Sequence, residues 1–173
     1  MTSKTCARQW VISGVLLEYY SGGSLQHILD GQRIEAFPWE RWPIQIGTAL
    51  HHFHMAKKTY MDLKPSNLVI NGDGDAVLID VSGIGRITHE WRAPEIWDEI
   101  SPLELSLQVR QLNDTWAYGK LLLLLASSAG NSPFVSTLKD VSPRLTEDDV
   151  QTRWTISDTI CPLESVQLVD KWN

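Results

Sequence analysis

The stretch YMDLKPSNLVI, Tyr60 to Ile70, places three polar groups in a short loop directly before an apolar run. The carboxylate of Asp62 can accept a proton from a hydroxyl nucleophile. The ammonium group of Lys64 can neutralise charge on a phosphoryl group, and the amide oxygen of Asn67 is a hard ligand that suits Mg²⁺. A base, a cation and a metal ligand in one loop are typical of phosphoryl transfer.

A second carboxylate belongs to the same region. The apolar runs Leu68–Ile70 and Ala76–Asp80 are joined by the sequence NGDGD, which predicts a tight hairpin turn. Because the two strands of a hairpin pair, we expect Asp80 to return towards Asn67. The loop and the hairpin would then surround one point with two carboxylates, an amide and a cation.

The rest of the chain predicts an α+β fold in which helices dominate. Branched and aromatic residues from Val11 to Tyr20 predict a strand. Apolar spacing and capping residues predict helices over the ranges Ser24–Leu29, Trp42–Met55, Asp114–Ser127, Thr146–Thr152 and Asp158–Val169. In the third of these, we expect Asp114 to be the N-cap.

Composition narrows the class of protein. The 173 residues suit one domain, and the net charge of −6 argues against a nucleic-acid binder, which would carry a basic face. The longest apolar run, Leu121 to Ala126, is too short to span a bilayer, and the N-terminus lacks the apolar core of a signal peptide. We therefore expect an intracellular, cytoplasmic protein that binds neither nucleic acid nor membrane.

The loop and five other segments resemble the protein kinase family. Residues 60–67 are similar to the catalytic-loop pattern H-R-D-L-K-x-x-N, of which the Asp, Leu, Lys and Asn are present. The other segments lie in the family's order: the hinge-like LLEYYSGGSL (16–25), Asp80-Val81-Ser82 in place of D-F-G, the intact Ala93-Pro94-Glu95, the Asp114, Trp116 and Gly119 of D-x-W-x-x-G, and Arg153-Trp154-Thr155-Ile156. The resemblance thus runs from the hinge nearly to the C-terminus.

The resemblance implies a role for each site residue. Asp62 would be the catalytic base and Lys64 a phosphate contact of the serine/threonine type, while Asn67 and Asp80 would bind Mg²⁺. Val69 would form the floor of the adenine pocket of ATP. Asp114, besides capping its helix, would hold the backbone of the catalytic loop. The hinge would contribute a gatekeeper side chain and backbone groups for the adenine edge, from Leu17, Glu18, Tyr19 and Tyr20. The implied partners are ATP and a protein substrate or partner protein.

The chain also departs from the family pattern. No Gly-rich loop and no strand lysine precede the hinge, so we expect residues 1–173 to form a single incomplete kinase-like domain without the small lobe. Residues 1–23 would be the hinge strand and linker, and residues 24–173 the helical large lobe. Met61 replaces the Arg that would bind an activation-loop phosphate, and Ser82 replaces a flexible Gly.

Two functions remain open at this point. The first is ATP- and Mg²⁺-dependent phosphoryl transfer to Ser or Thr of proteins, weak or absent in the isolated chain. The second is a pseudokinase or stand-alone large lobe that acts as a protein-binding module. A lone large lobe would expose the apolar face that a small lobe covers, so we expect poor solubility or a covering partner.

Two other motifs are weaker. NGDGDAVLIDVS resembles a calcium-binding EF-hand loop, but Ala76 occupies the place of the required Gly and Ser82 the place of the final Glu. The run HHFH, His51 to His54, lies on a predicted helix without an acidic or Cys partner in the sequence. A turn and a solvated helix face are the simpler interpretations.

Overall fold

The computed structural model describes residues 18–81, 88–101 and 104–170. Its helices and strands follow the order α1 (Leu25–Asp30), α2 (Arg41–Met55), β1 (Leu68–Ile70), β2 (Ala76–Leu78), α3 (Leu107–Ser128), α4 (Pro133–Leu145) and α5 (Ile156–Asp170). Four short 3₁₀ turns connect them, at Ile34–Ala36, Pro65–Asn67, His89–Trp91 and Pro94–Ile96. The predicted helix-dominated α+β class is confirmed.

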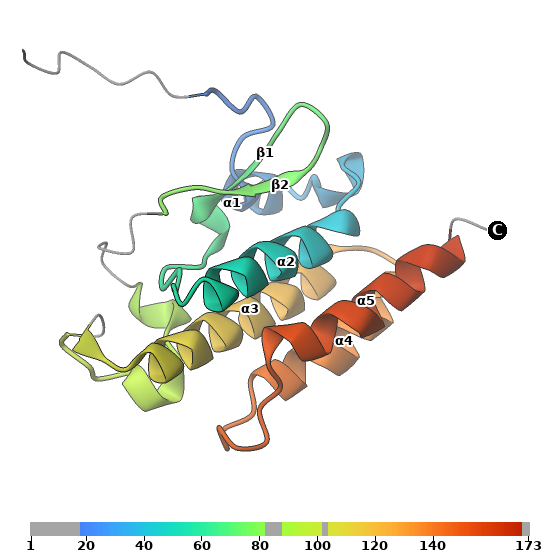
Figure 1. Ribbon diagram of the computed structural model, residues 1–173. Helices are drawn as coiled ribbons and strands as arrows, with labels where there is room; N and C mark the ends of the chain where they lie inside the picture. Colours follow the sequence, from blue (N-terminus) through green and yellow to red (C-terminus); the bar gives the residue numbers. More distant parts are fainter. Residues whose placement is uncertain (1–17, 82–87, 102–103, 171–173) are drawn as a thin grey trace, which may run out of the picture.

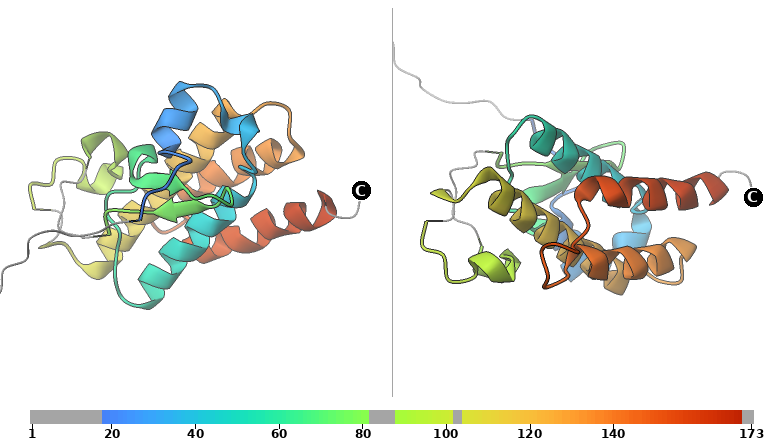
Figure 2. Two further views of the ribbon diagram at one scale, coloured as in Figure 1. Left: turned by 90° about the horizontal axis from the view of Figure 1, so that it is seen from above. Right: turned by 60° about the horizontal axis from the view of Figure 1, so that its bottom comes forward.

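The helices form a bundle with the β-hairpin on one side of it. The long helix α3 packs against α4, and α5 packs against both α2 and α4 (Figure 1). The β1–β2 hairpin lies over α2, as the view from above in Figure 2 shows. The loop from Ala56 to Asn67 therefore runs between the bundle and the hairpin, where the predicted site residues lie.

The hairpin forms where the sequence predicts it. Leu68 pairs with Leu78 and Ile70 with Ala76 in an antiparallel register. The side chain of Asn71 closes the turn, because its Oδ1 accepts hydrogen bonds from the backbone N–H groups of two later turn residues. Trp42 of α2 donates its indole N–H to the carbonyl of Gly74 at 2.8 Å, which fixes the turn on the helix.

Buried faces follow the predicted helical spacing in α2. Trp42, Ile46 and Leu50 are fully buried in the main core. Tyr118 of α3 crosses to this helix and donates its hydroxyl to the carbonyl of Pro43 at 2.7 Å. Burial raises the pKa of Tyr118 well above its usual value. Among the described residues, no helix has both the length and the apolar character needed to cross a membrane.

Two of the helix predictions are wrong, one in where the helix begins and the other in predicting a helix at all. The helix α3 begins after the N-cap Ser106, not at Asp114, which lies fully buried inside it. Residues 146–152 form turns rather than a helix, and the helix of this region, α4, lies earlier, at Pro133–Leu145. The helices predicted at Ser24–Leu29, Trp42–Met55 and Asp158–Val169 are confirmed as α1, α2 and α5, with bounds that differ by one to two residues.

The predicted strand from Val11 to Tyr20 lies mostly outside the described residues. Its last three residues, 18–20, have no regular structure. A backbone hydrogen bond of 3.0 Å from Ile70 to the carbonyl of Gly23 and a β-bridge between Ser24 and Val69 attach the following segment to the hairpin. This attachment brings residues 18–24 next to β1.

Candidate functional site

Asp62 is the centre of the site, because its carboxylate accepts four hydrogen bonds. Its Oδ1 receives the backbone N–H of Thr88 at 3.0 Å and the Thr88 hydroxyl at 2.9 Å. Its Oδ2 lies 2.7 Å from Lys64 Nζ and 2.9 Å from Asn67 Nδ2. The structure thus brings together three of the residues that the sequence predicts. Hydrogen bonds to both oxygens hold the Asp62 carboxylate in one orientation.

Thr88 is the site residue that the sequence analysis missed. Besides its two bonds to Asp62, it accepts a hydrogen bond from Lys64 Nζ on its hydroxyl oxygen at 2.7 Å. A single threonine in a polar segment produces no pattern that would single it out. Thr88 lies seven residues before Glu95 of the intact Ala93-Pro94-Glu95 motif, and this spacing is the sequence signal that could have directed attention to it.

Asn67 is buried, and its amide is oriented by the loop. Its Nδ2 donates to the carboxylate of Asp62 and to the backbone carbonyl of Asp62, both at 2.9 Å. The amide nitrogen is therefore fully used, and the Oδ1 atom is the one left to coordinate a cation. Amide and carboxylate oxygens are the donors that Mg²⁺ prefers, so Asn67 and the nearby Asp80 fit the ion that the family uses.

Asp80 follows the hairpin at the point where the two strands separate. The backbone N–H of Ile79 donates to the carbonyl of Asn67 at 3.0 Å, so Asp80 is one residue away from direct pairing with Asn67. Its backbone has φ = 56°, in the left-handed region that a non-glycine residue adopts only at a cost of about 1–2 kcal/mol. The expectation that the hairpin returns Asp80 towards Asn67 is confirmed.

A pocket opens beside Asp80 on the hairpin side of the molecule. It has a volume of about 670 Å³ and is lined by Glu18, Tyr19, Tyr20, Gly23, Ser24, Val69, Ile79 and Asp80. The predicted adenine-floor residue Val69 and the three predicted hinge residues 18–20 therefore share one cavity with a predicted metal ligand. Leu17, the predicted gatekeeper, lies outside the described residues. The nucleotide roles of these residues remain predictions.

The backbone of the loop is held from inside the bundle by Asp114. Its Oδ1 accepts the N–H of Met61 at 2.6 Å, and its Oδ2 accepts the N–H of Tyr60 at 2.8 Å. His54 Nε2 lies 3.0 Å from the same Oδ2. Met61 is held at φ = 69°, a second left-handed residue immediately before Asp62. The carboxylate of Asp114 thus fixes the strained backbone that presents the side chain of Asp62.

Tyr60 and Met61 both point away from solvent. The Tyr60 hydroxyl donates to the carbonyl of Ile79 and so ties the loop to the end of the hairpin. Burial, with smaller contributions from the charges of Asp62, Asp80 and Asp114, raises the pKa of Tyr60 well above its usual value. Met61 forms a small apolar cluster with Ala93 and Ile96. An apolar side chain buried there has no means of binding a phosphate group.

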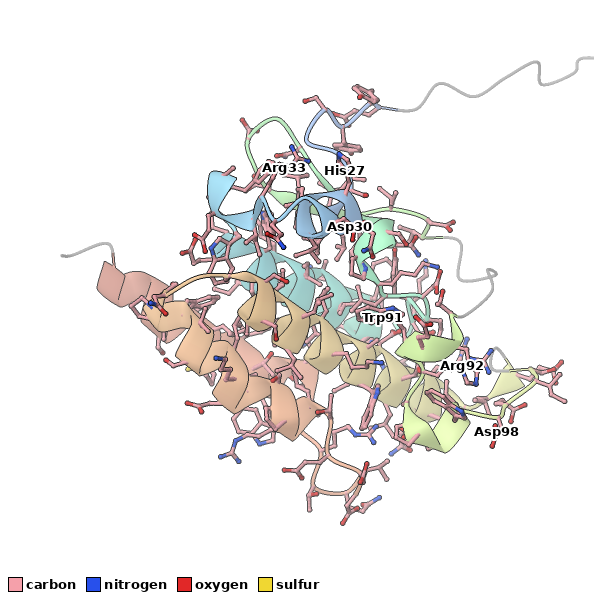
Figure 3. All side chains as sticks on the ribbon, turned by 180° about the vertical axis from the view of Figure 1, so that it is seen from behind. His27, Asp30, Arg33, Trp91, Arg92 and Asp98 are labelled. Atoms are coloured by element: carbon pink, nitrogen blue, oxygen red, sulfur yellow. The ribbon has the colours of Figure 1, made fainter. Side chains whose placement is uncertain are left out.

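The segment from residue 88 to 101 forms the outer wall of the site. Figure 3 shows its labelled side chains, Trp91, Arg92 and Asp98, next to the ribbon of this segment and well apart from His27, Asp30 and Arg33, which lie around α1. Arg92 donates to the carbonyl of Glu99 at 2.8 Å within the segment. At its centre, Glu95 forms a two-bond ion pair with the buried Arg153.

The sequence as a whole matches known kinases. A family model described as "Protein kinase domain" matches residues 4–167. The chain is 30% identical over 145 residues to serine/threonine-protein kinase 17A of Oryctolagus cuniculus, which covers 72% of this chain and 34% of that protein. It is 31% identical over 137 residues to a death-associated protein kinase related protein of Drosophila melanogaster, which covers 70% of this chain and 19% of that protein. The chain thus spans about a third or less of these relatives' length.

The matched range includes the loop, the hairpin and the bundle in which the site is built. A third relative is protein kinase C delta type of Mus musculus. The chain is 30% identical to it over 132 residues, which cover 69% of this chain and 18% of that protein. The first of these three relatives is a serine/threonine-protein kinase by name, and the names of the other two contain the words protein kinase. The fold and the family match agree, and the chain belongs to the protein kinase family.

Proposed function

We propose that this chain contributes the ATP- and Mg²⁺-dependent transfer of phosphate to Ser or Thr hydroxyls of intracellular proteins. The observation that carries the proposal is the hydrogen-bonded set of Asp62, Lys64, Asn67 and Thr88. Lys64, Asn67 and Thr88 converge on the Asp62 carboxylate. Such convergence is difficult to explain by packing alone, because a partly buried polar cluster costs free energy unless its members are paired.

Each residue of the set has a task in this reaction. Asp62 accepts the proton that the substrate hydroxyl loses as its oxygen attacks phosphorus. Lys64 places a positive charge within 2.7 Å of that carboxylate, next to the path of the transferring group. Asn67 Oδ1 and Asp80 would hold Mg²⁺, which neutralises phosphate charge when it is bound. Thr88 keeps the base in one orientation through two hydrogen bonds.

We further propose that the 173-residue chain alone transfers phosphate slowly or not at all. The described residues that line the nucleotide pocket come from segment 18–24, from β1 and from the end of the hairpin. The cavity that they line is partly open to solvent. Water that enters it competes for the phosphates and weakens the electrostatic interactions that catalysis needs.

A thermal-shift titration of the purified chain with Mg-ATP tests the nucleotide site. We expect a rise in melting temperature that saturates with ligand, since a ligand that binds only the folded state stabilises it. Asp80→Ala should remove the rise, whereas Asp98→Ala, an exposed carboxylate away from the pocket, should retain it. No rise at millimolar Mg-ATP would contradict the proposed site.

A phosphate-transfer assay tests the second half of the proposal. With a generic Ser/Thr peptide and radiolabelled ATP, we expect incorporation at or near the background of the Asp62→Ala variant. Steady transfer that disappears in Asp62→Ala would show that the isolated chain is catalytically complete. That outcome would support the phosphoryl-transfer role and overturn the expectation of weak activity.

A protein-binding module is the second candidate, supported by exposed apolar side chains. Trp97 is 43% exposed and Ile100 94%, both on the outer wall of the site, and Leu123 of α3 is 50% exposed. Large exposed apolar groups are common at protein interfaces. Size-exclusion chromatography of the purified chain tests whether such side chains form a face that needs a covering partner. Self-association would support such a face, and a well-behaved monomer would argue against it.

A further inference from the structure

A second cavity lies away from the nucleotide pocket, between three elements of the bundle. It has a volume of about 460 Å³. The C-terminal end of α2 contributes residues 51–55, the first half of α3 contributes residues 108–115, and residues 150–157 complete the wall where the chain enters α5. No residue that lines it also lines the pocket beside Asp80.

The cavity has an apolar interior and an amide-rich rim. Ile156 is buried, and Leu112 and Trp154 are half-buried within its wall. Gln108 and Gln151 are exposed, and Gln111, which also lines the cavity, is half-buried. Ligand pockets of 300–1,000 Å³ typically combine an apolar lining with a few orienting polar groups, and this cavity has both.

The lining carries no unpaired charge. Arg153 is the one Lys, Arg, Asp or Glu among the described residues that line it. Its guanidinium is already paired with both carboxylate oxygens of Glu95, at 2.6 and 3.1 Å. A charged ligand would lose its hydration here without gaining a carboxylate or a free Lys or Arg side chain as its counter-ion, which weakens its binding. The cavity therefore suits an uncharged ligand.

His54 connects this cavity to the catalytic loop. It lines the cavity, and its Nε2 lies 3.0 Å from the Asp114 oxygen that also holds the backbone N–H of Tyr60. Gln111, which also lines the cavity, donates to the backbone carbonyl of His54 at 3.3 Å. A ligand that displaces His54 thus acts on the carboxylate that orients the two residues before Asp62.

We propose that this cavity binds an uncharged small molecule with an apolar ring body and an amide-like polar edge, and that its occupancy is transmitted to the catalytic loop through His54 and Asp114. The ring would fill the space beside Leu112 and Ile156, and the polar edge would meet the glutamine amides. A protein partner is the poorer fit, because a specific protein interface buries about 800 Å² on each side and this cavity is a compact hollow. The proposal does not depend on phosphoryl transfer by this chain.

Nuclear magnetic resonance of the full ¹⁵N-labelled chain tests the site with 2-naphthamide as the probe. We expect chemical-shift changes that saturate with ligand concentration in the side-chain amide signals of Gln108, Gln111 and Gln151. The backbone amide signals of Tyr60 and Met61 should shift in the same titration. The charged analogues 2-naphthoate and 2-naphthylmethylamine should bind at least about tenfold more weakly. The backbone signals of Gly23 and Val69, in the nucleotide pocket, should not move.

Filling the mouth of the cavity provides the matched control. Gln108→Trp, at an exposed helix position, should weaken 2-naphthamide binding by about tenfold or more. Gln151→Trp is a second blocking variant at an exposed turn position. Gln26→Trp makes the same change at an exposed position of α1, outside the cavity, and should leave binding unchanged.

Each outcome decides one part of the proposal. No shift of the three glutamine amides at millimolar 2-naphthamide overturns the site. Equal binding of the charged analogues overturns the inferred chemistry of the ligand. Shifts confined to the glutamines, with Tyr60 and Met61 unmoved, overturn the coupling to the catalytic loop. Shifts in both groups that both blocking variants remove support the whole proposal.

Discussion

Arg153 and Glu95, 58 positions apart in the sequence, form a bidentate ion pair with distances of 2.6 and 3.1 Å. The Arg153 side chain is completely buried, while that of Glu95 is 23% exposed. The guanidinium also lies 5.0 Å from the centroid of the Trp116 ring, and its Nε donates to the carbonyl of Glu147. One side chain therefore joins the outer wall of the site, α3 and the turn before α5.

Removal of the buried cation should destabilise the protein strongly. We expect Arg153→Met to lower the free energy of unfolding by about 3–5 kcal/mol, because Glu95 and the carbonyl of Glu147 lose a shared partner. Urea denaturation measures the change. Arg41→Met, which breaks an ion pair with Asp75 that is 44% and 33% exposed, should cost about 1 kcal/mol or less. Equal losses for both variants would show that burial does not determine the strength of these pairs.

The hydrogen bonds by which Asp114 holds the loop before Asp62 can be tested in the same way. Asp114→Asn places an amide N–H against a backbone N–H in a fully buried position, so we expect a loss of about 3 kcal/mol. His54→Gln removes only one contact with the same carboxylate and should cost about 1 kcal/mol. Denaturant unfolding measures the loss in the free energy of unfolding for each variant. A loss for His54→Gln as large as that for Asp114→Asn would contradict the central role of the carboxylate.

Gly119 of α3 is expected to tolerate no side chain. A Cβ atom there would lie 2.7 Å from Leu145 Cβ and 2.7 Å from Thr146 Cγ2, so α4 would have to move. We expect Gly119→Ala to lower the free energy of unfolding by about 1–3 kcal/mol. Gly72→Ala in the hairpin turn meets no atom within 4 Å and should change it by about 0.5 kcal/mol or less. Thermal melts of the two variants compare them directly.

The two buried tyrosines predict a loss of stability in alkaline solution. Their pKa values in the folded state are raised above the usual value of about 10, so the folded state keeps protons that the unfolded chain releases. The stabilisation is complete below about pH 10 and falls as the pH rises further. Urea unfolding at several pH values between 8 and 11 measures how steeply the free energy of unfolding falls with pH. This fall should be less steep in Tyr60→Phe, and an unchanged fall would contradict burial of this hydroxyl.

Local patterns in the sequence predicted the parts of the site that depend on neighbouring residues. Asp62, Lys64 and Asn67 lie within one loop, and the hairpin turn NGDGD sets the return of Asp80. These features depend on short-range geometry, which a sequence records directly. Thr88 reaches Asp62 from 26 positions away, and no local pattern encodes such a contact.

The errors in the helices have physical reasons. Asp114 was predicted as an N-cap because a carboxylate commonly accepts backbone N–H groups at a helix start. It does accept two such groups, but they belong to Tyr60 and Met61 rather than to its own helix. These two bonds are the hold on the loop backbone that the resemblance to kinases implies for this residue. The helix α4 was missed because Pro133 and Pro143 interrupt its pattern, although Pro133 occupies the first turn, where its missing N–H costs little.

The hydrogen bonds from Tyr60 and Met61 to Asp114 also determine how long this loop stays closed to solvent. Backbone amides in a loop usually exchange their hydrogens with water within a short time, since local opening of a loop costs little free energy. Here both amides donate to a fully buried carboxylate in α3, so opening of the loop would leave a buried charge without its partners. We expect deuterium to enter these two positions much more slowly than it enters the exposed hairpin turn, which makes this part of the loop a kinetic part of the core.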